Sequence, residues 1–450
     1  MTRMRGVGLA LILMSSGVSF LWGLLEVRSV NGRPVDFQVI YYGSRCLMQH
    51  RNPYSAKELE GVYRGAGGEL PTENLRHHEI VTQIENLPAI LLLVAPLAML
   101  PYGLAETLWL VLLTGSFTLA ACLVWDVSAR SAPRLSLLLI CVLMANSEIL
   151  FMTGNSAGLA VGLCVMAVWC FLNQRFAAAG VVCLAVSLAL KPHDAGLVWL
   201  YFLLAGGVYR KRAIQTVALT VALGLVAVAW VTWAAPHWFG DWRSNLAALS
   251  ARGGFDDPGL TSLTGHSAGM VIDLQGAVSV LLDDARIDNL VSYLVCGALL
   301  LAWSVRTLRL HFSQRGAWLA LAAVVPLTML VTYHRTYDAK LLLITVPACA
   351  MLWVEGGFIR WIALVVNTAG LVVTGDISLT VLMILARHWH AGAAGILGGM
   401  LTIVLMRPTP LVLLAMGGFY LWVYVRRDPA RDAMPRRGRS REAVLPPTPA

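Results

Sequence analysis

Asp36 is the residue in this sequence best placed to act as a catalytic base. It follows the first apolar segment closely, in the polar and aromatic stretch VDFQVIYYGSRCLMQHRNPY from Val35 to Tyr54. A carboxylate just outside the bilayer, at the mouth of a helix bundle, can accept a proton from a lipid-borne substrate. The same stretch could also be a solvated loop that merely joins two helices. The remaining polar turns of the chain decide between these alternatives.

Three later turns carry ionisable or amide side chains that suit a phosphorylated substrate. Cations hold a phosphate or pyrophosphate at a lipid surface, and a carboxylate deprotonates a sugar hydroxyl. Any one of these residues could instead be a side chain that snorkels at a helix end. Their convergence on the side of Asp36 favours sugar transfer from a lipid phosphate. The predicted substrate-binding residues are Tyr42, Arg45, Asn52, Tyr54, Asn155, Lys191, His193, His334, Arg335 and Asp338.

The composition is that of a polytopic membrane protein. Of 450 residues, 58% are hydrophobic and only 13% are charged. The net charge of +9 comes from basic residues between apolar runs and in the tail from Arg426 to Arg441. This distribution is what membrane orientation requires, so it argues against nucleic acid as a partner.

The basic clusters also orient the chain. DVSARSAPR, NQR, YRKR and RTLRLHFSQR each adjoin apolar segments, and such clusters remain in the cytoplasm. Arg3 and Arg5 hold the N-terminus inside, and Val7–Leu25 is long enough to be an uncleaved first helix. The turns that carry the candidate residues then all face outward.

Pro88–Leu100 leaves two interpretations open. It is shorter than the roughly 20 residues that a span needs, contains Pro96 and is followed by Pro101. It could be a short spanning helix, or a re-entrant or surface helix on the outer side. The second interpretation places every basic cluster in the cytoplasm, whereas the first requires that a helix be lost elsewhere. The sequence favours the second.

The predicted fold is an all-α polytopic membrane protein with about 12–14 transmembrane helices and two large outward loops. The predicted segments are a first transmembrane helix at 1–25, an outward loop with the short re-entrant or surface helix at 26–103, a transmembrane bundle at 104–234, an outward loop at 235–287, a C-terminal transmembrane bundle at 288–425 and a disordered basic cytoplasmic tail at 426–450.

The sequence requires no metal or other cofactor, although a divalent metal stays possible. Cysteine and histidine show no metal-ligand spacing. Two adjacent acidic pairs, Asp256-Asp257 and Asp283-Asp284, lie in polar stretches. We interpret both pairs as solvated turns, and we expect the cations of the site to neutralise a phosphate without an ion.

An ordered set of motifs resembles glycosyltransferase family 87, a group of polytopic enzymes with the GT-C fold. The motifs are DF-x3-YY before NPY, then PLAMLPYGLAETLW, TGNSAGL, AGVVCLAVSLALKPH and YHRTYDAKLLL. They extend over roughly Gly6 to Pro347 and leave the C-terminal bundle unmatched. Two positions depart from the family pattern: Asn155 stands where many relatives have Gln, and NLP at Asn86–Pro88 replaces a YPP-like entry to the short helix.

The resemblance implies a GT-C fold in which Asp36 is the catalytic residue of the first outer loop. It also implies an inverting transferase that takes a mannose- or arabinofuranose-like sugar from a polyprenyl-phosphate donor. The acceptor would be a glycolipid or cell-envelope glycan, and the enzyme would lie among the lipids of a bacterial inner membrane with its active site facing the periplasm.

Two other classes compete with the enzyme. A secondary transporter or lipid-linked sugar flippase would place ionisable residues within the middle of its helices. The apolar runs are almost free of charge apart from Glu148, near one end of Leu135–Met152. A membrane scaffold would not need its polar clusters on one face. Both alternatives fit less well than the transferase.

Overall fold

The computed structural model is almost entirely helical, and it describes residues 2–30, 33–68, 80–259, 270–282, 284–388 and 396–426. Among these residues the only extended pairing is one antiparallel bridge between Val271 and Arg335. The helices are α1 (Thr2–Val30), α2 (Val35–Met48), α3 (Ala56–Gly65), α5 (Pro88–Ala98), α6 (Tyr102–Ser128), α7 (Pro133–Ala145), α8 (Glu148–Thr153), α9 (Ala157–Leu172), α10 (Ala177–Leu190), α11 (Pro192–Leu204), α12 (Gly207–Ala234), α13 (Trp238–Ser250), α15 (Leu274–Leu282), α16 (Ala285–Arg309), α17 (Gln314–Val331), the 3₁₀ helix η1 (Asp338–Thr345), α18 (Val346–Glu355), α19 (Ile359–Val373), α20 (Asp376–His388), α21 (Ile396–Met406) and α22 (Pro408–Val425).

The chain is an all-α polytopic membrane protein, as predicted. Within the described residues, six helices are long and apolar enough to cross a bilayer, and α19 with α20 would make a seventh, bent by 63°. Five shorter apolar helices accompany them. The total of about 12–14 crossings stays a prediction, because it depends on how these shorter helices lie in the bilayer.

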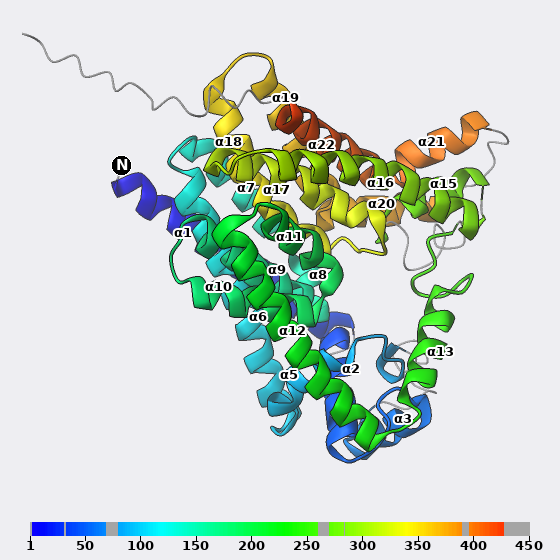
Figure 1. Cartoon of the computed structure of the whole chain (residues 1–450). Coiled ribbons are helices and arrows are strands. Elements are labelled where there is room, and N and C mark those ends of the chain that lie inside the picture. The colour runs from blue at the N-terminus through cyan, green and yellow to red at the C-terminus, as the bar shows by residue number, and fades with distance from the viewer. Residues whose placement is uncertain are drawn as a thin grey trace, which may run out of the picture.

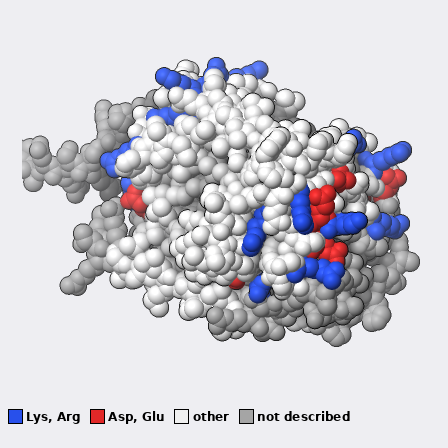
Figure 2. All heavy atoms as spheres, turned by 90° about the horizontal axis from the view of Figure 1, so that it is seen from below, with Lys and Arg blue, Asp and Glu red and all other residues white. Residues whose placement is uncertain are grey.

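The apolar helices differ in how much of their surface faces lipid. α17 is central, with 83% of its apolar window buried, and it packs against α11, α16, α22 and η1. By contrast, only 17% of the window of α12 is buried. A helix that is apolar all round and largely uncovered is a membrane-facing helix. Figure 2 shows most charged side chains gathered on the right-hand part of the viewed face, with a broad uncharged surface beside them.

A second, smaller hydrophobic core holds α2, α3, α5 and α13 together at one end of the molecule, the lower end in Figure 1. Its centre is aromatic: Tyr42 stacks on Tyr102 at 5.8 Å and meets the edge of Tyr63 at 5.1 Å. Aromatic rings of this kind bury large areas and fix relative orientation. We call the four helices the outer unit.

The stretch predicted as one outward loop, 26–103, is thus mostly helical and packed. Cys46, expected in an outward polar loop, is buried in α2. The second predicted loop, 235–287, contains α13 and α15, while 260–269 lies outside the described residues. α2 forms a helix because its hydrophobic residues recur three and four positions apart within a polar stretch. Its buried side chains pack mainly on α5.

Within the outer unit, two tyrosine hydroxyls bind the chain on either side of α5. The hydroxyl of Tyr54 donates to the carbonyl oxygen of Asn86 at 2.9 Å, and that of Tyr41 donates to Leu100 at 2.7 Å. Its 11 residues make a helix about 16 Å long, roughly half the thickness of the hydrocarbon core. The re-entrant placement of Pro88–Leu100 stays a prediction, and this short length is an argument for it.

A buried ion pair connects three segments that are distant in sequence: η1, the turn between α7 and α8, and the start of α20. Lys340 Nζ lies 3.6 Å from Asp376 Oδ1 and also donates to the carbonyl oxygen of Asn146. Asp376 Oδ2 accepts from the backbone N–H of Ile149 at 3.1 Å. Side chains of Lys340 and Asp376 are only 3% and 2% exposed, so loss of either partner would leave the other as an uncompensated buried charge.

Lys340→Met should therefore lower the free energy of unfolding by about 3–5 kcal/mol, measured by chemical denaturation in detergent micelles. Adding Asp376→Leu should recover much of this loss, because no buried charge then remains. Arg315→Gln is the control: its pair with Glu355 is exposed, and the change should cost no more than about 1 kcal/mol. Equal effects of the two single substitutions would contradict the assignment.

Candidate active site

Four segment ends meet at one place between the outer unit and the bundle. They are the start of α2, the turn between α8 and α9, the break between α10 and α11, and residues 332–338 between α17 and η1. The break at Lys191 follows from Pro192, because the residue before a proline is driven out of the helical region. Gly154 ends α8 with φ of +64°, and a Cβ there would lie 2.8 Å from Pro34, so glycine permits the start of α2 to approach.

Asp36 lies at the start of α2 and is only partly accessible. Asn155 Nδ2 donates to Asp36 Oδ2 at 2.7 Å. Burial raises the pKa of Asp36 above its ordinary value, while the Asn155 hydrogen bond and the charges of Arg335 and Lys191 work against that rise. A carboxylate with a raised pKa is a stronger base than an ordinary one, which suits proton abstraction.

Lys191 forms a buried ion pair with Asp338. Its Nζ lies 2.6 Å from Asp338 Oδ1 and 4.6 Å from the centre of the Tyr337 ring. Asp338 Oδ2 accepts from the backbone N–H of Arg335 at 2.8 Å. Burial lowers the pKa of Lys191, but the charges of Asp338, Asp194 and Asp36 and the hydrogen bond to Asp338 together outweigh it, and the net direction is upward. The side chain is thus a positively charged ammonium group held in place by Asp338, and its charge interacts with that of Asp36.

Arg335 is held by residues of the segment that follows α13. Its Nη2 donates to Asp256 Oδ1 at 2.7 Å and to the carbonyl oxygen of Phe255 at 2.9 Å, with its guanidinium 4.0 Å from the centre of the Phe255 ring. The hydroxyl of Tyr333 donates to the same Asp256 oxygen at 2.6 Å. The buried guanidinium therefore fixes the loop after α13 against the site.

The prediction that Asp256-Asp257 is a solvated turn is wrong. Both residues are buried, at 9% and 6% exposure. Asp256 is the partner of Arg335, and Asp257 accepts hydrogen bonds from the backbone N–H groups of Gly253 and Gly259, each at 2.8 Å. Of the other pair, Asp283 lies outside the described residues. Asp284 caps α16 by accepting from Arg286 at 2.8 Å.

His193, Asp194 and His334 form a third cluster beside Lys191. Asp194 Oδ1 lies 3.5 Å from His334 Nε2 and 3.8 Å from His193 Nε2. The ligand atoms of the three side chains all lie within 4.8 Å of one another, and no second such group occurs among the described residues. Burial lowers the pKa of His334 and the Asp194 carboxylate raises it, with a net rise.

Glu85 also belongs to the site, although its sequence context gave no signal beyond a carboxylate close to the short helix α5. Burial and the neighbouring Asp256 carboxylate raise the pKa of Glu85, while Arg335 and Lys191 lower it. It is therefore a further acidic group within electrostatic range of both cations. Tyr333 and Asp256 were likewise missed as members of the site.

The structure brings together Asp36, Asn155, Lys191, His193, His334, Arg335 and Asp338. The other four predicted binding residues pack in the outer unit. Tyr42 and Tyr54 are buried in its aromatic core, Arg45 donates to the Tyr41 hydroxyl at 3.1 Å, and Asn52 donates to Asp241 at 2.6 Å. Their role in binding substrate stays a prediction.

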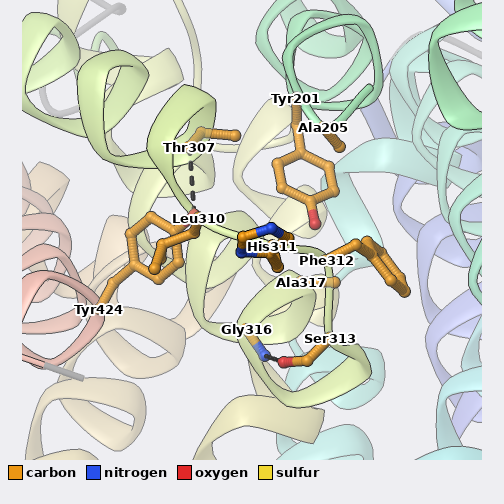
Figure 3. A pocket seen from close by; sticks show the side chains of 10 residues that line it. All are labelled: Tyr201, Ala205, Thr307, Leu310, His311, Phe312, Ser313, Gly316, Ala317 and Tyr424. Carbon is orange, nitrogen blue, oxygen red and sulfur yellow. Dashed lines mark hydrogen bonds between the residues drawn. The ribbon is translucent and has the colours of Figure 1, made fainter. Parts of the chain in front are cut away.

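A small pocket lies at the other end of the bundle and is distinct from this site. It is lined by Tyr201 near the end of α11, by residues around His311 that precede α17, and by Tyr424 of α22 (Figure 3). The site adjoins the opposite ends of α11 and α17. The 18 residues of α17 separate the two places by about 27 Å.

Comparison with known proteins identifies the family of the chain. The model of glycosyltransferase family 87 matches residues 87–332, more than half of the chain. The match includes Asn155, Lys191 and Asp256, whereas Asp36 precedes it and His334 follows it. No curated protein and no solved structure matches the chain. The chain belongs to glycosyltransferase family 87 and is a multi-pass membrane glycosyltransferase.

Proposed function

We propose that the protein transfers a mannose- or arabinofuranose-like sugar from a polyprenyl-phosphate donor to a glycolipid or cell-envelope glycan, with inversion at the anomeric carbon. One observation carries the proposal: a partly accessible carboxylate, Asp36, is oriented by Asn155 and lies within electrostatic range of Lys191 and Arg335. A base beside fixed cations suits a hydroxyl acceptor and a phosphate leaving group. Family membership favours this enzyme over the transporter or flippase.

The reaction is a single displacement. The acceptor hydroxyl oxygen attacks the anomeric carbon and forms the new glycosidic bond, while the bond from that carbon to the phosphate oxygen breaks. The electron pair of the broken bond goes to the polyprenyl phosphate, and the hydroxyl proton goes to Asp36. Lys191 and Arg335 stabilise the charge that develops on the phosphate.

An isoprenoid donor needs apolar surface that reaches from the site to lipid. α10 and α11 meet at Lys191, and both pack against α12. Because α12 is mostly uncovered and its exposed side chains between residues 217 and 229 are all apolar, we propose that the polyprenyl chain lies along this side of the bundle.

The site should face the periplasm, with the bundle in a bacterial inner membrane. This proposal is supported by the distribution of Lys and Arg, which cluster in the segments assigned to the cytoplasm.

A cysteine at Gly65, where a side chain would meet open space, should react with a membrane-impermeant maleimide in intact cells. Ser131→Cys should react only after permeabilisation. The unaltered chain, whose eight cysteines are buried or half-buried, is the background control. The reverse labelling pattern would place the site in the cytoplasm.

Asp36→Asn should reduce sugar transfer by ~10²–10⁴-fold, since it keeps the shape of the side chain but removes the proton acceptor. Thermal stability should stay equal or rise, because the raised pKa of Asp36 means that its charged form costs folding free energy. The assay is release of polyprenyl phosphate from a polyprenyl-phosphate sugar by purified protein.

Asp126→Asn is the matched control for that experiment. Asp126 is 38% exposed and pairs with Arg130 at the far end of α6, so its loss should leave turnover unchanged. Full activity in a stable Asp36→Asn protein would exclude Asp36 as the base. A loss of stability with normal turnover per folded molecule would make it a structural carboxylate.

Asn155→Ala should shift the acid limb of the pH–rate profile to higher pH. The Asn155 amide stabilises the ionised form of Asp36, so its removal raises the pKa of that carboxyl further. Asn155→Gln, which can still donate, should shift the limb less. An unchanged acid limb in Asn155→Ala would mean that Asp36 does not set the pH dependence of kcat/KM.

A further inference from the structure

The side chains of His193, Asp194 and His334 lie together beside Lys191, and each has polar atoms without a hydrogen-bond partner. Nε2 of His193, Nε2 of His334 and both carboxylate oxygens of Asp194 have no hydrogen-bond partner among the described residues. His334 and Asp194 are almost fully buried, at 0% and 1% side-chain exposure. Buried polar atoms left without partners are costly, so such a group calls for a ligand.

The histidines are arranged as ligands rather than as core residues. His334 Nδ1 lies 2.8 Å from the carbonyl oxygen of Thr332 and donates to it in the neutral ring, which leaves the lone pair of Nε2 facing Asp194. A backbone carbonyl that accepts from the other ring nitrogen is one of the usual ways in which a protein orients a metal-binding histidine. The His193 side chain is 33% exposed although its Nε2 is buried, so the cluster lies close to the protein surface.

The spacing suits a small divalent ion. Ligand atoms at about 2.0–2.1 Å from a tetrahedral zinc lie roughly 3.3 Å apart. The separations of 3.5 and 3.8 Å from Asp194 Oδ1 to the two imidazole nitrogens are close to that value. Two imidazoles and one carboxylate are also a typical donor set of catalytic zinc sites, which keep a position open.

The charges of the site supply an independent reason. Lys191 and Arg335 are the cations available to a phosphate, yet each already has a buried carboxylate partner, Asp338 and Asp256. Asp36 and Asp194 add two further acidic groups. Neutralising a departing phosphate against this acidic surplus needs more positive charge than the two side chains provide. A bound divalent ion would provide it.

We propose that Nε2 of His193, the carboxylate of Asp194 and Nε2 of His334 bind one divalent transition-metal ion, with zinc as the ion best matched to these donors. Its open coordination positions would accept oxygens of the donor phosphate. The binding of the ion is independent of the proposed function, whereas its role at the phosphate rests on it. This site replaces the expectation that the two cations alone suffice.

The test measures binding first and activity second. Full-length protein is purified without a polyhistidine tag, stripped with a chelator and titrated with Zn²⁺ by calorimetry, and with Co²⁺ by visible absorption. We expect one ion per chain with nitrogen and oxygen ligation. His193→Gln and Asp194→Asn should each abolish this stoichiometric binding, and thermal unfolding will verify that both variants fold.

His237→Gln is the matched control, because His237 is exposed and lies outside the site. It should bind the ion as the unaltered chain does. No binding by the unaltered chain would overturn the proposal and leave His334 and Asp194 as a simple ion pair. Binding that survives both substitutions, or a thiolate charge-transfer band with Co²⁺, would equally overturn it, since the ion would then lie elsewhere.

Activity separates this inference from the proposed function. If the chelated protein loses release of polyprenyl phosphate and Zn²⁺ restores it, the ion acts on the phosphate as proposed. If the ion binds at the three residues but chelation leaves turnover unchanged, its role at the phosphate is refuted. If the ion binds and no donor is ever turned over, the proposed function fails while the metal site stands.

Discussion

The buried ion pair between Lys191 and Asp338 is the interaction on which the geometry of the site depends. It joins the break between α10 and α11 to the start of η1, two segments 147 residues apart. Asp338 also accepts from the backbone of Arg335, so the same carboxylate sets the path of the chain that carries His334 and Arg335. A pair this deeply buried is tolerated only when both charges are present and further hydrogen bonds satisfy them. The site is assembled around that requirement.

Under the proposed function, the same pair limits what Lys191 can offer to a phosphate. A charge that holds two segments together is already largely compensated, and it offers less to a second anion than a free lysine would. Arg335 is in the same position, because Asp256 and Tyr333 occupy its guanidinium. Asp36, by contrast, is partly accessible and has the Asn155 amide as its hydrogen-bond donor. The charges with a structural partner and the proposed base are thus different residues of the same site.

Much of this arrangement could be predicted from the sequence, because helix length and basic clusters decide which turns share a face. That argument placed Asp36, Asn155, Lys191 and His334 together. It could not predict that Asp256 lies in the site. The path of a long polar segment depends on tertiary contacts, and the spacing of its hydrophobic residues does not indicate them. The same argument placed His193 and His334 on the same side of the membrane but could not show that their ring nitrogens and the Asp194 carboxylate lie within 4.8 Å of one another. Tyr42 and Tyr54 were predicted to bind substrate because they lie in a polar and aromatic stretch. In the structure both are buried in the smaller hydrophobic core.

That local core has an evolutionary consequence. The buried residues around α2, α3 and α5 form a hydrophobic cluster separate from the one that fills the main bundle. Asp36, the proposed base, lies on the first turn of α2, whereas Lys191, His193 and His334 belong to the bundle. Bundle helices also contribute to the smaller cluster, for example Leu190 beside Lys191, but α3 packs mainly on α2. Substitutions in α3 can therefore change the smaller cluster without altering the core of the main bundle. Under the proposed function, such changes would alter the entrance for acceptors and leave the binding site of the donor phosphate in place.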